Sequence, residues 1–308
     1  MTASTLTVAS WNAERNGRLP RPGPGRYASH REVLAHYRPH IVLRQELLTR
    51  APGDETDLWT EANALGLHGF MARTAEGRSK YATGVMTDPQ LFETVRPSHH
   101  DLPWKPIAHV RVRRRGLPGI LHLASAHLTH FCAGLRATEA RRLTTLGERG
   151  RTALIGLDAN SYPHRTDEET TTPLDWSTVD DPAHYWHRTL ERAGQRVCDT
   201  RPSEILTAPA PCGRPVFTDL GHHAATELGQ PDALKATASL RRTDQGPPQR
   251  VDWITSTPDL SHALLKFEVV DTADIAHWSD HALTLAHFDL DAVDRVLSTT
   301  HPLVEQGS

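Results

Sequence analysis

The 308-residue sequence contains three cysteines, Cys132, Cys198 and Cys212, and none of them lies in a Cys-x-x-Cys pair. An odd number of widely spaced cysteines argues against a disulfide framework and against a structural zinc site. Lysine is also scarce and occurs only at positions 80, 105, 235 and 266. With 34 Lys+Arg against 37 Asp+Glu, the formal charge of −3 gives no strong field, which excludes a polybasic nucleic-acid binder.

Long apolar runs are missing too. No stretch approaches the ~18 uninterrupted apolar residues of a membrane span, and the N-terminal segment has no basic stretch followed by an apolar one. We therefore expect a soluble, cytoplasmic protein without a membrane span, and a monomer. Hydrophobic residues nevertheless make up 38% of the chain, which is enough to form a packed core and excludes disorder.

Short runs rich in Val, Ile and Leu are typical of strands and occur at 6–10, 41–43, 107–112, 120–126, 153–157, 251–255, 267–270 and 283–288. Helices are predicted at 29–37, 54–65, 134–149 and 181–193. Ser29 is the expected cap of the first helix, with Glu32 three residues later as in a capping box.

The sequence 116–119, Gly-Leu-Pro-Gly, predicts a hairpin connection between two of these strands. Two irregular stretches, 18–26 and 161–181, are either loops at a site or plain surface loops. Strands mixed with helices and hairpins indicate a layered α/β protein with a mixed sheet system. We expect one domain over 1–290 and a short C-terminal tail at 291–308, which begins as a short helix.

Six of the segments place polar side chains at the ends of predicted strands. They read SWNAE (10–14), LRQE (43–46), SAHLTH (125–130), GLDAN (156–160), RVDW (250–253) and WSDH (278–281). Such side chains are costly to bury without partners, so their convergence on one face would build a polar site. Carboxylates with few cysteines favour a hard ion, Mg²⁺ or Mn²⁺, over zinc.

In this order the motifs NxE, QE, H, DxN, RxDxI and SDH resemble those of the endonuclease/exonuclease/phosphatase superfamily, the deoxyribonuclease I-like fold. They run from Trp11 to His281 and so extend over nearly the whole chain. The resemblance implies a four-layered α/β sandwich, two facing β-sheets flanked by helices. It places the site at one edge, where strands end.

The resemblance also implies catalytic roles for six residues. Asn12 would position the phosphate or another side chain, and His127 would contact the scissile phosphate or assist the leaving group. Asp158 would align or deprotonate the attacking water, and Asn160 would bind the phosphate. Asp252 would orient His281, and either His281 or Asp158 would be the general base.

For the cofactor, Mg²⁺ (or Mn²⁺), the resemblance implies Glu46 as the principal ligand, with Asp280 and Glu14 close to the ion. The sequence departs from the family at two places. Leu157 stands directly before Asp158 where the family usually has glycine, and Gly156 lies one residue earlier. Arg44 replaces a small or apolar residue and is either a phosphate contact or a partner for a helix end.

Other residues have two interpretations each. His130 either points into the same cleft or is one of many surface histidines among the 20 in the chain. The doublets His99-His100 and His222-His223 lack ligand spacing and are expected at the surface. The tryptophans beside the motifs, Trp11, Trp253 and Trp278, are expected to pack beneath the site, or one of them stacks on a base or ring.

The sequence predicts the substrate less directly than it predicts the fold or the site, because one fold can act on many substrates. The leading hypothesis is a metal-dependent phosphoesterase acting on phosphodiesters, most simply a nuclease acting on nucleic acid. The alternatives are a phosphatase or phosphodiesterase of a small-molecule or lipid phosphate, and a catalytically inactive phosphate-binding module. RVDWITS at 250–256 lacks the signature of phosphoinositide 5-phosphatases. An arginine cluster at 111–115 either contacts phosphates or is solvated.

Overall fold

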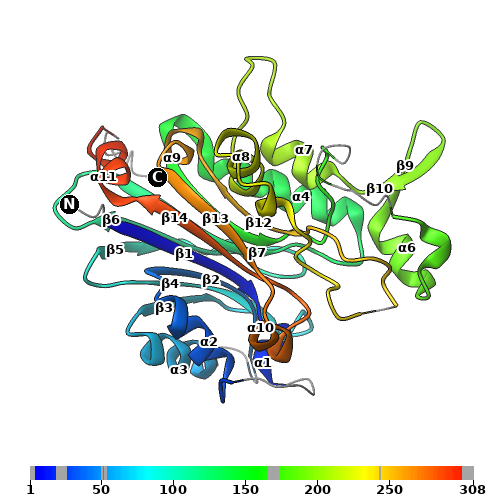
Figure 1. Ribbon diagram of the computed structural model, residues 1–308, viewed down its shortest axis with the longest axis horizontal. Coiled ribbons are helices and arrows are strands. Elements are labelled where there is room, and N and C mark those ends of the chain that lie inside the picture. The colour runs from blue at the N-terminus through cyan, green and yellow to red at the C-terminus, as the bar shows by residue number, and fades with distance from the viewer. Residues whose placement is uncertain are drawn as a thin grey trace.

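The computed structural model describes residues 4–18, 26–49, 51, 54–165, 169, 174–242 and 244–299. Within them, two six-stranded sheets face each other (Figure 1). The first sheet has the order β13-β14-β1-β2-β4-β3, with strands Leu264–Val270 (β13), Leu283–Asp289 (β14), Thr5–Asn12 (β1), Ile41–Leu48 (β2), Tyr81–Thr87 (β4) and His68–Ala72 (β3). The second has the order β11-β12-β8-β7-β6-β5, with strands Thr218–Asp219 (β11), Asp252–Ser256 (β12), Thr152–Asp158 (β8), Ile120–His127 (β7), Ala108–Arg114 (β6) and Phe92–Pro97 (β5).

Both sheets are mixed, as predicted. Strands β1 and β2 are parallel, as are β7 and β8, and the other pairs are antiparallel. The predicted hairpin joins β6 and β7, and Gly116 there has a φ of 83°, which glycine adopts at little cost. A separate hairpin is formed by β9 (Thr189–Arg192) and β10 (Gln195–Cys198).

Helices cover the outer faces of both sheets. The outer face of the first sheet packs on α2 (His30–Tyr37), α3 (Thr56–Leu65) and α10 (Ala273–Trp278), and that of the second on α4 (Ala133–Thr144) and α7 (Arg201–Thr207). The remaining helices are α1 (Glu14–Gly17), α6 (Pro182–Arg188), α8 (Leu220–Glu227), α9 (Pro258–Ser261) and α11 (Leu290–Thr299), with 3-10 turns at Thr145–Gly150, Trp176–Thr178 and Pro231–Leu234.

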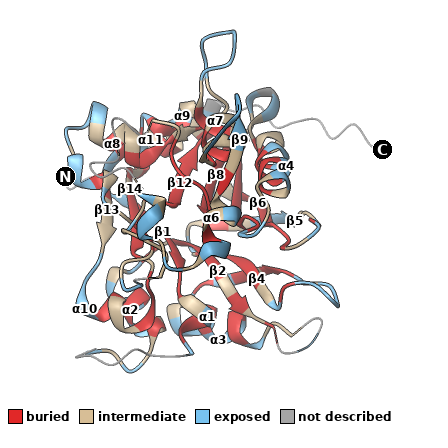
Figure 2. Cartoon of the chain, turned by 90° about the vertical axis from the view of Figure 1, so that its right-hand side faces the viewer, coloured by how far each residue is buried: buried red, intermediate tan, exposed pale blue. Residues whose placement is uncertain are grey.

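The hydrophobic core consists of three main layers of side chains. One lies between the sheets and includes Val8, Leu43, Leu123 and Leu154, and the other two lie between each sheet and its helices. In Figure 2 the strands are mostly buried, whereas exposed residues lie at the periphery. Helix, sheet, sheet and helix make a four-layered α/β sandwich, which confirms the predicted fold class.

Several predicted elements need correction. The helix predicted at 181–193 ends at Arg188, because Ala193 and Gly194 form a left-handed turn (φ of 52° and 76°) that makes 189–198 a hairpin. The helix predicted at 134–149 changes to a 3-10 turn after Thr144. The irregular stretch 18–26 lies mostly outside the described residues. Among the described helices, none is both long and apolar enough to cross a membrane.

Other details agree with the prediction. Ser29 caps α2, since its side chain accepts a hydrogen bond from the Glu32 amide at 3.4 Å, and the Glu32 carboxylate accepts one from the Ala28 amide at 3.1 Å. The helix expected near the C-terminus is α11. It buries Val293 and Leu297 in the core between the sheets.

Candidate active site

The predicted polar residues meet at one edge of the sandwich. The parallel pairs β1/β2 and β7/β8 bring strand ends together, so Asn12 lies beside Gln45 and His127 lies beside Asp158. Strand β12 runs antiparallel to β8 and begins where β8 ends, which places Asp252 opposite Asp158. The segment before β14 adds Asp280 and His281. Both sheets therefore supply residues to one cleft of about 470 Å³.

Close approach of the sheets explains the glycine at 156. A Cβ atom there would lie 2.5 Å from the Ser10 hydroxyl oxygen and 2.7 Å from Leu43 Cβ on the facing sheet. Leu157 is fully buried in the helix-side core. The sequence Gly-Leu-Asp thus serves inter-sheet packing, and Asp158 still lies at the strand end.

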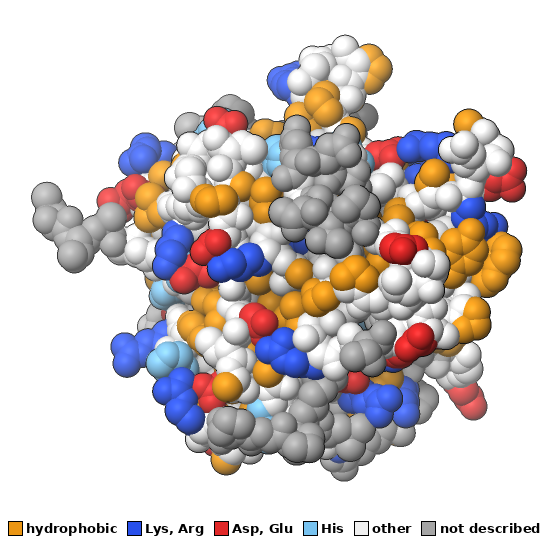
Figure 3. Space-filling model, turned by 45° about the vertical axis from the view of Figure 1, so that its right-hand side comes forward, with side chains coloured by type: hydrophobic (Ala, Val, Ile, Leu, Met, Phe, Trp, Pro, Cys, Tyr) orange, Lys and Arg blue, Asp and Glu red, His pale blue; other side chains and the backbone are white. Residues whose placement is uncertain are grey.

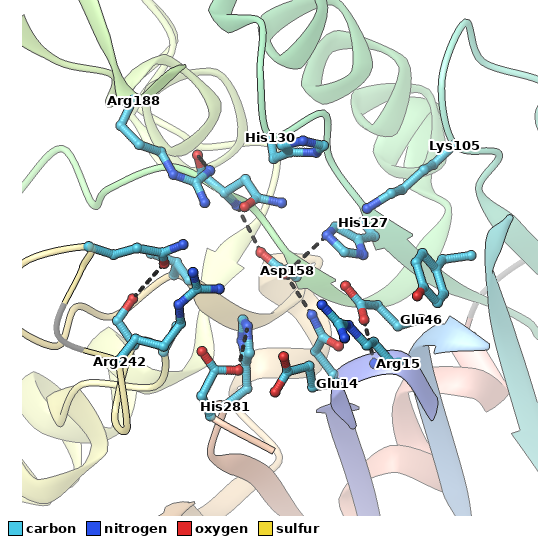
Figure 4. A pocket seen from close by; sticks show the side chains of 18 of the residues that line it. Glu14, Arg15, Glu46, Lys105, His127, His130, Asp158, Arg188, Arg242 and His281 are labelled. Atoms are coloured by element: carbon cyan, nitrogen blue, oxygen red, sulfur yellow. Dashed lines mark hydrogen bonds and ion pairs between the residues drawn. The ribbon is translucent and has the colours of Figure 1, made fainter. Parts of the chain in front are cut away.

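Asp158 is the centre of the site (Figure 4). Its Oδ2 accepts a 2.9 Å hydrogen bond from Asn12 Nδ2 and lies 3.2 Å from His127 Nε2, and its Oδ1 accepts one from the Asn160 amide at 3.0 Å. Burial opposes ionisation, but His127, His281 and Lys105 hold the pKa of Asp158 well below its usual range. The carboxylate is therefore ionised and fixed in position.

His127 directs Nε2 at this carboxylate, 3.2 Å from Asp158 Oδ2. Burial, reinforced by the nearby Lys105 ammonium, lowers the pKa of His127 well below its usual value. With Nε2 directed at Asp158, the other nitrogen, Nδ1, is buried and has no hydrogen-bond partner among the described residues. The same is true of Asn12 Oδ1. Two polar atoms in the site are therefore left for a ligand or water.

His281 and Asp252 form the predicted pair. His281 Nδ1 lies 2.9 Å and 3.1 Å from the two carboxylate oxygens of Asp252. Burial works against a charged imidazole, yet the carboxylates of Asp252 and Asp280 raise the pKa of His281 well above its usual value. Burial also raises the pKa of Asp252 to about 6. Nε2, which Asp252 does not engage, lies near Asp280 Oδ1 at 3.9 Å.

Glu46 and the turn after β1 hold each other in place. Residues Arg15, Asn16 and Gly17 have φ of 51°, 58° and 61°, so the short α1 is a left-handed turn. Glu46 also has a positive φ, 57°, where β2 departs from regular pairing with β4. The Arg15 amide donates a 2.6 Å hydrogen bond to Glu46 Oε2. Positive φ at non-glycine residues is uncommon and concentrates at functional sites.

The donor atoms fit a hard divalent ion. Glu14, Glu46 and Asp280 line the cleft, and the orphaned Asn12 Oδ1 adds an oxygen there. A second grouping is also present. In the described part of the chain, the one set of three potential ligands with atoms within 4.8 Å of one another is Asp158, Asp252 and His281. Asp158 already bonds Asn12 and the Asn160 amide, and Asp252 and His281 bond each other.

The site contains cations that the sequence analysis did not single out. Lys105, Arg188, Arg15 and Arg242 line the cleft together with His130, Trp104 and Tyr162. The four cations lie outside the strand-end motifs, in the turn after β1, in loops and in α6, which is why no pattern indicated them. His130 was predicted as either a cleft or a surface residue, and it lines the cleft. Burial and the charges of Lys105 and Arg188 lower its pKa to about 4.

Arg44 is not a phosphate contact. It is fully buried and forms an ion pair with Glu61 of α3, with 2.7 Å between Nε and Oε1. Its other nitrogens donate to the carbonyl oxygens of Trp11 and Gln45 and to Asn16 Oδ1. Arg44 therefore ties the left-handed turn to β2 beneath Glu46.

The other open interpretations are also decided by the structure. Trp11, Trp253 and Trp278 are 1%, 1% and 8% exposed and pack beneath the site. The arginine cluster does not line the cleft, and three of its members have local partners in Glu93, Asp294 and the Pro89 carbonyl oxygen. On the face drawn in Figure 3, basic and acidic side chains are interspersed.

Comparison with known structures supports the fold. The chain is similar to D. rerio TDP2 humanized by 14 mutations (TM-score 0.57, 15% identity, covering 92% of this chain and 98% of that one). It is also similar to ANGEL2, a 2',3'-cyclic phosphatase, in complex with adenosine-2',3'-vanadate (TM-score 0.60, 14% identity, 92% and 95%). A third similar structure is an endonuclease/exonuclease/phosphatase protein of Bacteroides vulgatus (TM-score 0.55, 13% identity, 92% and 98%).

Neither a protein-family model nor a curated protein sequence matches the chain. The structural likenesses nevertheless extend over nearly the whole chain. The protein has the fold of the endonuclease/exonuclease/phosphatase superfamily, the deoxyribonuclease I-like fold, as its motifs predicted.

Proposed function

We propose that the protein is a divalent-metal-dependent phosphoesterase that hydrolyses phosphodiester bonds, with nucleic acid as its substrate. One observation carries the proposal. An ionised, buried Asp158, held by Asn12, His127 and the Asn160 amide, faces the same cleft as the His281–Asp252 pair and three further carboxylates. A site of this composition is suited to phosphate ester hydrolysis.

We assign Mg²⁺ (or Mn²⁺) to Glu46, with Asp280 and Glu14 close to it, because these carboxylates line the cleft and their donor chemistry suits a hard ion. When bound, the ion would neutralise negative charge on the phosphoryl group. The left-handed turn at Arg15 supports the assignment, since its amide holds one oxygen of Glu46 and so fixes the direction of the carboxylate.

The other residues have roles that follow from their contacts. Asp158 is an anionic acceptor that can orient a water molecule for in-line attack. Asn12 positions Asp158 through its amide, one of the two roles implied by the sequence. His281, oriented by Asp252, presents Nε2 to the cleft, where it can take a proton from water or hold one against a phosphate oxygen.

The assignment of nucleic acid rests on the cations of the cleft and on the structural neighbours. Lys105, Arg188, Arg15 and Arg242 would attract a phosphate backbone locally, although the net charge of the whole chain is −3. One neighbour is D. rerio TDP2 complexed with a single-strand DNA product (TM-score 0.57, 14% identity). The likeness to ANGEL2 favours the runner-up, a phosphodiesterase of small cyclic nucleotides.

A substrate panel tests the proposal. Purified protein is incubated with circular plasmid, linear duplex DNA, single-stranded DNA, RNA and a 2',3'-cyclic nucleotide, each with Mg²⁺, Mn²⁺ or EDTA. We expect cleavage of a nucleic acid that requires metal and is lost in Glu46→Gln protein. Cleavage of the cyclic nucleotide alone would establish the runner-up. Intact substrates throughout, combined with no calorimetric Mg²⁺ or Mn²⁺ binding, would indicate an inactive phosphate-binding module.

A further inference from the structure

Lys105 is a buried cation with no ion pair among the described residues, and the carboxylates of Glu46, Asp158 and Glu139 only partly offset the effect of burial on its pKa. It lies between β5 and β6, is 5% exposed and lines the cleft. Across the described residues its ammonium group has no hydrogen bond and no ion pair. Burial lowers the pKa of Lys105 to about 8, so the side chain is still largely charged at neutral pH. An unpaired buried charge is unfavourable unless something else binds to it.

Arg188 is half-buried and lies on the other side of His130 from Lys105 (Figure 4). It is the last residue of α6, and its Nη1 donates a 2.6 Å hydrogen bond to the Asn160 carbonyl oxygen. No carboxylate of the described chain lies within ion-pair distance of it. Burial lowers its pKa to about 10. Burial has the largest effect on the pKa of His130, and Lys105 and Arg188 lower it further. The charges of both cations therefore act on the same imidazole.

Three buried arginines of this protein are paired. Arg44 binds Glu61, Arg136 binds Asp199 at 2.8 Å, and Arg250 binds Asp219 at 2.6 Å. The fold therefore neutralises these buried arginines in its interior. Lys105 and Arg188 differ from them in two respects: both lack an acidic partner, and both line the cleft. The difference suggests that their partner is a ligand rather than a side chain.

We propose that Lys105 and Arg188 form a second anion subsite, which binds a further phosphate group of the substrate beside the scissile one. In Figure 4, Lys105, His130 and Arg188 lie on one side of Asp158, and Glu14 and His281 lie on the other. The acidic side suits a metal ion, whereas the basic side suits an anion directly. This subsite rests on the proposed function for the position of the scissile phosphate, and it makes the preferred substrate a nucleotide chain with neighbouring phosphates.

Binding of inorganic pyrophosphate in EDTA tests the subsite without catalysis. Without metal, the carboxylates repel an anion, so calorimetry reports the basic side of the cleft. We expect Lys105→Met to weaken binding at least about 10-fold, as loss of a charge-assisted hydrogen bond predicts. Lys105→Arg retains the charge and should retain most of the affinity. Lys266→Met, the same change at an exposed lysine outside the cleft, is the control. Equal affinity in all four proteins, or equal loss in Lys266→Met, would overturn the proposal.

A pair of matched esters separates this subsite from the proposed function. With metal, turnover is compared for the p-nitrophenyl ester of thymidine 5'-phosphate and for the same ester carrying a 3'-phosphate. We expect a lower KM for the second ester in the wild type and a loss of this preference in Lys105→Met. Turnover of both esters without preference would refute the subsite and leave the phosphoesterase activity intact. No turnover of either, with pyrophosphate binding that depends on Lys105, would refute the activity and support the subsite.

A third substrate, the dinucleotide TpT as its 5'-p-nitrophenyl phosphate ester, identifies the source of the second phosphate. A preference for it over the 3'-phosphorylated mononucleotide would indicate an internal backbone phosphate. The opposite order would indicate a terminal phosphate. Both orders support the subsite, and equal rates for all three esters would contradict it.

Discussion

The backbone amide of Arg15 donates a 2.6 Å hydrogen bond to Glu46, and both residues have a left-handed backbone. Two uncommon conformations thus stabilise each other at the predicted metal ligand. Arg44 stabilises the same turn, because it donates a 3.0 Å hydrogen bond to Asn16 Oδ1. Arg44 also forms an ion pair with Glu61. The geometry of Glu46 therefore depends on a fully buried ion pair that does not line the cleft.

Removing one member of this pair should be strongly destabilising. We expect Arg44→Met to lower the free energy of unfolding by about 3–5 kcal/mol, since it leaves the Glu61 carboxylate buried without its main partner. The double variant Arg44→Met/Glu61→Met should recover much of the loss. Chemical denaturation measures both.

The exposed pair of Arg192 and Glu204 is the control for that experiment, with 2.8 Å between its charged atoms. Arg192→Met should change stability by less than about 1 kcal/mol, because surface ion pairs contribute little. A loss for Arg44→Met no larger than for Arg192→Met would show that the buried pair does not support the turn.

Lys105 should lower the free energy of unfolding. Burial lowers the pKa of Lys105 from 10.5 to about 8. The folded protein therefore binds this proton more weakly than the unfolded chain does. We expect Lys105→Met to raise the free energy of unfolding at pH 7 by about 1–3 kcal/mol. The wild type should also gain stability as pH rises from about 8 to 10.5, and the variant should lack this gain. A Lys105→Met protein less stable than wild type would contradict the account.

Three histidines form a hydrogen-bonded row on the second sheet. His100 Nε2 lies 3.0 Å from His109 Nδ1, and His109 Nε2 lies 3.0 Å from His122 Nδ1. Arg142 donates to His100 Nδ1 at 3.1 Å, which places the hydrogen of neutral His100 on Nε2. His109 Nδ1 also lies 3.0 Å from the Ser98 carbonyl oxygen. His100, expected at the surface, is partly buried, because tertiary packing lines it up with two strand residues.

This row predicts acid sensitivity. Burial, with the neighbouring histidines, Arg111, Arg142 and Arg151, lowers the pKa to about 4 for His100, about 3 for His109 and about 4 for His122. Their contribution to stability is complete above pH 6.5 and is lost as pH falls toward 4, because the unfolded chain binds protons first.

A His109→Gln variant measures that contribution. Between pH 6 and 4.5, its free energy of unfolding should fall less steeply than that of the wild type, by about 1.4 kcal/mol per pH unit, the effect of one proton. Other buried histidines act in both proteins and cancel in the comparison. Identical slopes would show that the row is not held neutral.

Asp252 and His281 should act as one unit. We expect either Asp252→Asn or His281→Asn to lower kcat by about 10²- to 10⁴-fold, the range for a positioned acid–base group. The double variant should be no slower than the His281 single variant, because Asp252 works through the imidazole that it orients. Independent, multiplying losses would indicate separate roles.

Much of the fold could be predicted because strands such as 120–126 and 153–157 are short runs rich in Leu, Ile and Ala. Strands β3, β4 and β5 were missed, since HGFMA has no β-branched residue, YATGVMT is interrupted by glycine and FETVRP is mostly exposed. Their pairing is set by tertiary contacts. Gly84 in β4, for example, leaves room for Leu47 and Leu58, whose atoms would lie 2.4 Å and 3.1 Å from an added Cβ.

The site was predictable where chemistry coincides with a strand end. Asn12, His127, Asp158, Asn160, Asp252 and His281 lie as the motif order implied, because the ends of the strands fix them. Lys105 and Arg188 could not be predicted in this way. The fold brings the loop of Lys105 and the end of α6 to the cleft, and an isolated lysine or arginine carries no periodicity or spacing. Arg44 was ambiguous because its partner, Glu61, lies on a separate helix.

The most direct test of the central claim is the rate of phosphodiester hydrolysis by Asp158→Asn protein. This change keeps the shape of the side chain and removes the charge that Asn12, His127 and the Asn160 amide hold in place. With bis(p-nitrophenyl) phosphate and Mg²⁺ or Mn²⁺, we predict a loss of at least about 10³-fold in kcat/KM, with an unchanged circular dichroism spectrum. Equal rates for wild type and variant would contradict the assignment of Asp158 as the centre of a phosphoesterase site.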